Sequence, residues 1–143
     1  MRVNFGRAAN LIGSARQTVV DWASDGVLPI NHQSAVKSLD LCGLLCAAVI
    51  RDLRSRGMDL PAIRPITQFI CEVGEETLRA EIQQGNSLLI WNAGDEMPQI
   101  VKSNRRISTY ALSSMTVTID LAMAFERTRK ALSTKQQPEL VLT

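Results

Sequence analysis

Apolar residues recur every three or four positions along much of the chain, the spacing that buries one face of an α-helix. This pattern predicts six helices, at residues 5–11, 15–24, 39–56, 59–73, 75–84 and 119–132. Residues 87–91 and 99–102 are predicted strands around a turn at 92–98, and residues 108–118 are expected to hold one or two more short strands. The expected fold class is therefore α+β, mainly α.

The first two helices are predicted to be joined by a tight turn. Gly13 suits that turn because glycine tolerates a positive φ. Ser14 is expected as the N-cap of the second helix, and Gln17 three residues later would complete a capping box. Gly26 and Pro29 are expected to end this helix. Together these signals predict a helix-turn-helix.

The two faces of the second predicted helix differ in character. Its inward face carries Val19, Trp22 and Ala23. Its opposite face carries Arg16, Gln17 and Val20. Because Trp22 belongs to the apolar face, we interpret it as a core residue.

The segment 30–38 has no helical period and could form a short hairpin, a wing beside the two helices. Ser38 is expected to cap the helix at 39–56, with Asp40 in its first turn. Asp59 is then expected to open the fourth helix.

The change from helical to strand-like patterns suggests a division of the chain. We predict a winged helix-turn-helix domain at 1–73, a small α/β dimerisation or interaction region at 74–132, and a flexible polar tail at 133–143. The last predicted helix bears an apolar stripe, and the residues of this stripe expected in a homodimer contact are Leu121, Phe125 and Leu132.

Charge is distributed unevenly, although the net charge is only +2. Residues 1–70 hold eight Lys or Arg and five Asp or Glu, whereas residues 71–143 hold eight and nine. The base-rich half is the one with the helix-turn-helix pattern, as a nucleic-acid-binding protein would require. The longest apolar stretch, 41–50, is too short to span a bilayer, and no signal peptide is visible at the amino terminus. We therefore expect a cytoplasmic protein without a membrane association.

Neither catalysis nor a cofactor is predicted. The sequence has no Cys–His or Ser–His–Asp constellation and no phosphate-binding glycine loop, and its single histidine is His32. Cys42 and Cys46 would share one helix face, but a zinc site usually needs four ligands in tightly spaced pairs. We interpret these cysteines and Cys71 as free thiols in a reduced compartment, with no metal site.

The pattern of residues 13–29, with Gly13-Ser14, Thr18-Val19, Trp22 and Gly26-Val27-Leu28-Pro29, resembles the MerR-type winged helix-turn-helix. The run from Leu53-Arg54 through Gly57 and Leu60 to Ile63 is similar to the signature of that family's third and fourth helices. The resemblance covers about residues 5–70. It implies a DNA-binding transcriptional regulator that acts as a homodimer.

The sequence departs from the family at several positions. Val20 stands where the family usually has arginine, and the wing sequence Val36-Lys37-Ser38 has only Lys37 as a base. The strand-rich carboxyl half does not match the metal- or drug-sensing members.

Short polar or guanidinium side chains near the start of a recognition helix can read base edges. The predicted base-reading residues are Ser14, Arg16, Gln17 and Thr18. His32, Gln33 and Lys37 on the wing, and Arg7 on the first helix, are predicted to contact the phosphate backbone or minor groove. A capping box on a solvated helix face and a polar loop are the alternative interpretations. Arg54, Arg56 and Arg64 are expected to be solvated or paired with Asp52 and Asp59.

The preferred function is thus sequence-specific binding of double-stranded DNA by a homodimer. One alternative is a protein-interaction module, such as an antitoxin or phage adaptor, that grips another protein through its carboxyl half. Another is an excisionase-like architectural protein, which DNA bending would reveal.

Overall fold

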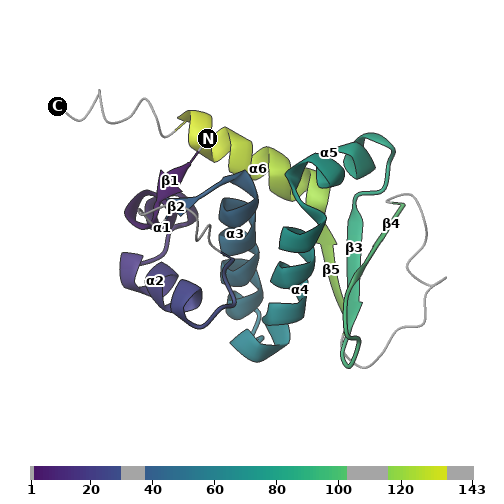
Figure 1. Ribbon diagram of the computed structural model, residues 1–143, viewed down its shortest axis with the longest axis horizontal. Coiled ribbons are helices and arrows are strands. Elements are labelled where there is room, and N and C mark those ends of the chain that lie inside the picture. The colour runs from purple at the N-terminus through teal and green to yellow at the C-terminus, as the bar shows by residue number, and fades with distance from the viewer. Residues whose placement is uncertain (1, 30–37, 103–115, 135–143) are drawn as a thin grey trace.

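The computed structural model describes residues 2–29, 38–102 and 116–134, and these form an α+β fold that is mainly helical (Figure 1). The helices are α1 (Phe5–Ile12), α2 (Arg16–Ser24), α3 (Leu41–Ser55), α4 (Leu60–Val73), α5 (Glu75–Gln83) and α6 (Leu121–Thr134). The strands are β1 (Val3–Asn4), β2 (Ser38–Leu39), β3 (Leu88–Asn92), β4 (Gln99–Val101) and β5 (Thr116–Asp120).

Helices α3 and α4 run side by side through the centre of the molecule, with α1 and α2 on one flank and a small sheet on the other (Figure 1). Helix α6 crosses the top of this arrangement and packs on α3 (Figure 1). The sheet has the order β4-β3-β5, and both pairings are antiparallel. Strands β1 and β2 form a separate two-stranded sheet, in which Val3 is opposite Leu39.

Helix α3 is central because its first ten residues carry no polar side chain other than the cysteine thiols, so this part can be buried on every side. Ten of its fifteen residues are buried. Asp40 caps it, since its Oδ1 accepts the Gly43 N–H at 2.7 Å. The prediction that Ser38 caps this helix is wrong. Ser38 lies in β2, where pairing with Asn4 holds it extended, and the helix begins at Leu41.

Helix α4 begins where predicted. Asp59 caps it through a bond from the Ala62 N–H at 3.1 Å, and Pro61 lies in its first turn, where the missing N–H costs nothing. Pro65 lies inside the helix without ending it. Gly74, at φ +84°, ends α4 and begins α5.

The hairpin of β3 and β4 confirms the two strands predicted for residues 87–102. The last predicted helix starts two residues too early, because Ile119 belongs to β5, paired with Leu89. Of the strands expected at 108–118, residues 116–118 lie in β5 and the rest fall outside the described residues, as do the wing at 30–37 and most of the tail.

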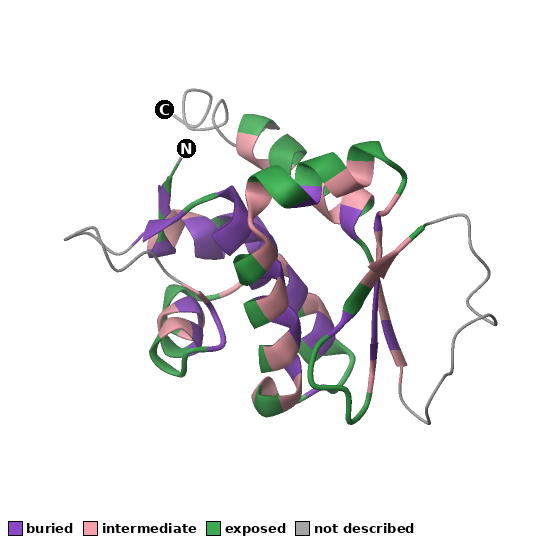
Figure 2. Cartoon of the chain, turned by 45° about the vertical axis from the view of Figure 1, so that its right-hand side comes forward, coloured by how far each residue is buried: buried purple, intermediate pink, exposed green. Residues whose placement is uncertain are grey.

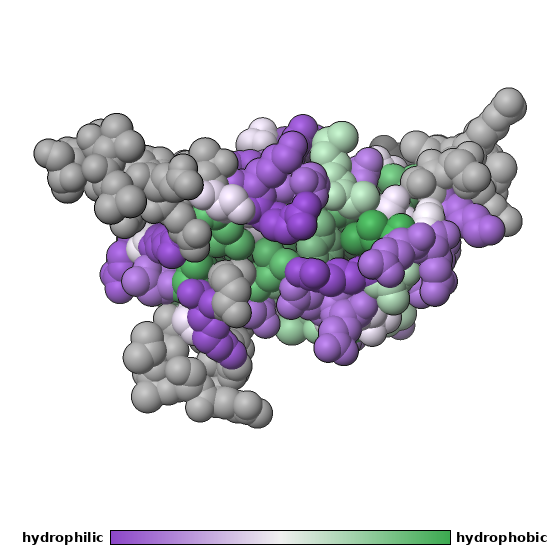
Figure 3. Space-filling view, turned by 90° about the horizontal axis from the view of Figure 1, so that it is seen from above, coloured by the Kyte–Doolittle hydropathy of each residue, from purple (hydrophilic) through white to green (hydrophobic). Residues whose placement is uncertain are grey.

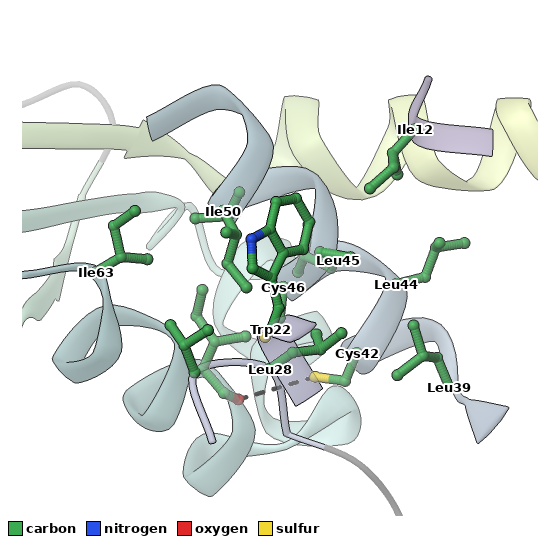
Figure 4. Close-up of a cluster of buried hydrophobic side chains, with 14 of the residues drawn as sticks. Ile12, Trp22, Leu28, Leu39, Cys42, Leu44, Leu45, Cys46, Ile50 and Ile63 are labelled. Carbon is green, nitrogen blue, oxygen red and sulfur yellow. Dashed lines mark hydrogen bonds between the residues drawn. The ribbon is translucent and has the colours of Figure 1, made fainter. Parts of the chain in front are cut away.

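One hydrophobic cluster joins the two predicted domains. It runs from Val3 in β1 to Leu121 at the start of α6, and it includes Leu89 and Trp91 from β3. Figure 2 shows the buried residues on the inner sides of the helices. In Figure 4, Trp22 and Leu28 lie among side chains of α3, including Leu45. The boundary predicted at residue 73 therefore does not separate two cores.

Candidate nucleic-acid interface

Helices α1 and α2 form the predicted helical pair, and a three-residue turn joins them. Gly13 has φ +73°, which confirms the left-handed conformation expected there, and it lets the Ser14 N–H reach the Ala9 carbonyl at 2.9 Å. Asn4 caps the start of α1 through the Arg7 N–H at 2.8 Å. We call residues 5–24 the α1–α2 pair.

The capping box predicted for α2 is wrong. Ala15 is the N-cap residue, and no side chain bonds the first turn of the helix. Gln17 Nε2 instead donates to Asp21 Oδ1 at 2.9 Å, one turn further along the exposed face. Because Asp21 holds the amide of Gln17, that amide is not turned back toward the start of the helix.

The sides of α2 are as predicted from the pattern except for Val20, which was predicted on the exposed face and is partly buried against the core. Val19 and Trp22 are buried in the core, whereas Arg16 and Gln17 are exposed and Thr18 is half-buried. Ser14, in the turn, is also half-buried. The structure thus leaves two long polar side chains free of the core at the first turn of the helix.

Basic side chains gather on the amino-terminal edge of the molecule. The first twenty residues contain Arg2, Arg7 and Arg16 and no acidic residue. A methyl group at Gly6 would lie 3.8 Å from the Arg16 Cδ, which places Arg16 of α2 beside the start of α1. Arg2 Nη1 donates to Ser38 Oγ at 3.0 Å and so joins the strands β1 and β2.

Arg7, predicted to contact DNA, has a guanidinium nitrogen without a hydrogen-bond partner among the described residues. Its side chain is half-buried, and this nitrogen, Nη2, is enclosed. A buried donor without a partner is costly, and for a cation the cost is higher.

Two arginines from the scaffold hold the carboxyl ends of both helices in the α1–α2 pair. Arg51 of α3 donates through Nη1 to the Ile12 carbonyl, and Arg64 of α4 donates through Nη2 to the Asp25 carbonyl. The last carbonyls of a helix lack partners inside it and carry partial negative charge, so a guanidinium is well suited there. The α1–α2 pair is therefore fixed to α3 and α4 at two separate points.

Arg54, Arg56 and Arg64 are exposed, which confirms that they are solvated, and Arg64 forms no ion pair with Asp59 among the described residues. In the structure Arg64 instead reaches a residue 39 positions earlier. Arg54, also expected to be solvated or paired with an acid, donates to the Met58 carbonyl at 3.1 Å. Arg51, which no sequence pattern linked to α1, pairs with Asp52 at 2.7 Å as well as capping α1.

Thr67 supplies a third link from α4. Its side chain is fully buried, and its Oγ1 donates to the Val27 carbonyl at 2.6 Å. Val27 and Leu28 follow α2 and are themselves buried. The segment that leaves α2 is thus fixed along with the helix.

The remaining predicted site residues are either outside the described residues or in the core. His32, Gln33 and Lys37 lie in the segment 30–37, which the structure does not describe. Leu121, predicted in a dimer contact, is fully buried in the chain's own core, so its side chain cannot face a partner. Phe125 and Leu132 are partly buried and pack against that core.

The three cysteines are free thiols, with Cys42 and Cys46 buried and Cys71 exposed. Burial raises the pKa of Cys42 to about 12, and the nearby carboxylate of Asp40 adds to the effect. Burial also raises the pKa of Cys46 and of Cys71. The Cys42 thiol faces the Ile70 carbonyl at 3.8 Å, the contact that the dashed line marks in Figure 4, and the Cys46 thiol faces the Thr67 carbonyl at 3.8 Å. They therefore remain protonated at neutral pH.

Over the described ranges, His, Cys, Asp and Glu form no group of three or more that could hold a metal ion. The described helices are too short or too polar to cross a membrane.

No known family model matches this chain, and no curated protein is significantly similar to it. The resemblance to MerR-type regulators therefore stays a prediction based on the residues quoted above.

Proposed function

We propose that this protein is a sequence-specific DNA-binding regulator whose α1–α2 pair contacts the duplex. The observation that carries the proposal is the amino-terminal edge, where three arginines and no acids occur in twenty residues, next to a short helix that exposes Arg16 and Gln17. Arginine can bond guanine through two hydrogen bonds, and glutamine can bond adenine in the same way.

The scaffold favours this role because base reading requires a helix held in a fixed position. Arg51 and Arg64 hold the carboxyl ends of α1 and α2 and so fix α2 on the scaffold. The first turn of α2 exposes Arg16 and Gln17. Arg2 and Arg7 would bind phosphates of the DNA backbone. Thr18, half-buried at the edge of α2, would contribute a short polar contact.

A homodimer is part of the proposal. One short recognition helix reads only a few base pairs, and two related by a two-fold axis would supply the affinity and specificity of an operator. With Leu121 committed to the core, the contact would use other surfaces of the carboxyl half, such as the outer edge of β4.

The test is selection of duplexes from a random pool, followed by binding measurements at several salt concentrations. We expect a palindrome with a fixed half-site spacing, and a protein mass in solution of twice 15.8 kDa by light scattering. Arg16→Ala should weaken binding to the selected sequence by about tenfold or more, because a bidentate contact with guanine contributes about 1–3 kcal/mol. Arg7→Ala should weaken all sequences alike and lower the salt slope by about 1.

Arg79→Ala is the matched control, because it removes one exposed arginine from α5, which lies on the opposite side of α3 and α4 from the α1–α2 pair (Figure 1). It should leave the affinity within about twofold. Unchanged binding by Arg16→Ala across sequences would contradict direct base reading.

A second candidate is a protein-interaction module, and one observation favours it. Asp21 on α2 and Asp25 just after it are exposed along with Arg16, and Asp21 accepts a hydrogen bond from Gln17. The negative charges of these carboxylates would repel the phosphates of a DNA backbone. If no duplex is enriched from the random pool, this candidate replaces the first.

A further inference from the structure

A groove of about 250 Å³ lies between α3 and the segment where β5 passes into α6. Its apolar lining includes Ala48 and Leu53 from α3 and Met123 and Ala124 from α6. Met123 is 50% exposed, one of two large hydrophobic side chains so exposed among the described residues. The view onto the side of the molecule where α6 lies shows hydrophobic surface flanked by hydrophilic residues (Figure 3).

A second, smaller hollow of about 90 Å³ adjoins the groove on the side toward α1. The two share Ala48, Arg51, Arg127 and Thr128, so these residues lie where the two spaces meet. Arg127 is therefore placed at the middle of a continuous depression along α6.

The charges in the groove are unbalanced. Its lining contains three guanidinium groups, from Arg51, Arg56 and Arg127, against two carboxylates, from Asp52 and Asp120. Both carboxylates are already engaged. Asp52 pairs with Arg51 at 2.7 Å, and Asp120 Oδ1 accepts the Met123 N–H at 3.0 Å at the start of α6.

Arg56 and Arg127 remain without such a partner. Neither forms an ion pair with any of the residues that the structure describes. The groove thus offers one net positive charge and two unengaged guanidinium groups beside apolar surface.

We propose that this groove binds a small organic carboxylate. Its apolar part would lie on Ala48, Leu53 and Met123, and its carboxylate would accept hydrogen bonds from the Arg127 guanidinium, with Arg56 at the other side. A planar guanidinium matches the two oxygens of a carboxylate. One negative charge also balances the groove, whereas a phosphate dianion would exceed its net charge.

The volume limits the ligand to a small molecule. Pockets for drug-sized ligands span about 300–1,000 Å³, and this groove lies below that range. A short fatty acid or a single-ring aromatic acid has the size and the chemistry that the lining requires.

The experiment titrates the full chain with hexanoate and benzoate, and separately with hexanamide and benzamide, and follows the backbone amides of Ala48, Met123 and Arg127 by NMR. We expect saturable shifts with both carboxylates in the millimolar range, and binding of the neutral amides weaker by about tenfold or more, because the charged hydrogen bonds are lost. The amides keep the shape and apolar surface of the acids, so the difference measures the carboxylate alone.

Arg127→Gln should weaken binding of the carboxylates by about tenfold or more and leave the amides unaffected. The matched control is Lys130→Gln. Lys130 lies about one turn after Arg127 on α6 and does not line the groove, so the loss of its positive charge should change the affinity by less than about twofold. Met123→Glu, at an exposed position in the groove, should abolish carboxylate binding by adding a negative charge.

Absence of saturable binding for both carboxylates would overturn the proposal. Equal affinity for acids and amides, or equal losses in Arg127→Gln and Lys130→Gln, would overturn it as well. Because these measurements contain no DNA, their outcome is independent of the proposed regulatory function.

Discussion

Individual buried contacts determine how the chain leaves α2. Thr67 is the clearest case, because its hydroxyl is fully buried and bonds the Val27 carbonyl of a segment 40 positions earlier. In the unfolded chain this carbonyl accepts a hydrogen bond from water. If the Thr67 donor is removed, the carbonyl is buried in the folded chain without any hydrogen bond, which is costly. The energetic effect of this one hydroxyl should therefore be large for a single atom.

Replacing Thr67 by valine keeps the shape of the side chain and removes the donor. We expect Thr67→Val to lower the free energy of unfolding by about 1–3 kcal/mol, measured by urea denaturation. Thr77→Val is the matched control, since Thr77 is exposed on α5, and it should change stability by less than about 0.5 kcal/mol. Equal effects of the two substitutions would mean that the Thr67 hydroxyl bond adds nothing.

At the scale of elements, helix starts are decided by which side chain reaches the first free N–H groups. Asp40 and Asp59 do so for α3 and α4, at 2.7 and 3.1 Å. Ser38 and Ser14 are of equally suitable type but do not cap. Ser38 is held in β2 by its pairing with β1, and Ser14 precedes a helix whose N-cap is Ala15.

This difference predicts unequal effects for two substitutions of cap-type residues. Asp40→Ala should lower the free energy of unfolding by about 1 kcal/mol, because it removes the acceptor of the Gly43 N–H. Ser14→Ala should change it by less than about 0.5 kcal/mol, because no side chain caps α2. Thermal unfolding of both variants tests the pair. A larger loss of stability for Ser14→Ala than for Asp40→Ala would mean that Ser14 does cap α2.

The elements that the sequence could predict are those with a repeated local pattern. Helices α1, α3 and α4 have apolar stripes, and the β3–β4 hairpin has alternation around a turn, so each was found within a few residues. The end of β5 was not found, because Ile119 is as apolar as the helix that follows and only its pairing with Leu89 makes it a strand.

The candidate site could be predicted only in part for the same reason. Exposure of Arg16 and Gln17 follows from the period of α2. The links from Arg51 to Ile12 and from Arg64 to Asp25 join residues 39 positions apart, and no local pattern specifies them. The partner of Gln17 was also missed, since Asp21, one turn along the helix, competes with the backbone for its amide.

At the scale of the whole molecule, the core connects both halves of the chain. Leu121, far along the sequence from α1, is fully buried in the same hydrophobic cluster as Ile12 and Val19. Helix α6 packs on α3, which also packs on α1 and α4. The protein should consequently unfold as one unit.

The whole-molecule prediction concerns the start of α6. Leu121→Ala should lower the free energy of unfolding by about 2–5 kcal/mol, because it leaves a cavity in the shared core. The loss should appear equally in a probe of α2, the fluorescence of Trp22 in a Trp91→Phe background, and in the loss of helix seen by circular dichroism. Met123→Ala, an exposed position on the same helix, should have an effect below about 0.5 kcal/mol. Two separate transitions would show that the halves fold independently.

Arg51 has a consequence for how the two ends of the molecule communicate. The same guanidinium bonds the last turn of α1 and lines the groove beside α6. A ligand that draws Arg51 toward the groove competes with the Ile12 carbonyl for the Arg51 guanidinium. Such a ligand therefore weakens the bond that holds the end of α1 on α3. Thermodynamic linkage then works in both directions: by whatever factor the occupied groove changes the affinity of the α1–α2 pair for its target, the bound target changes the affinity of the groove.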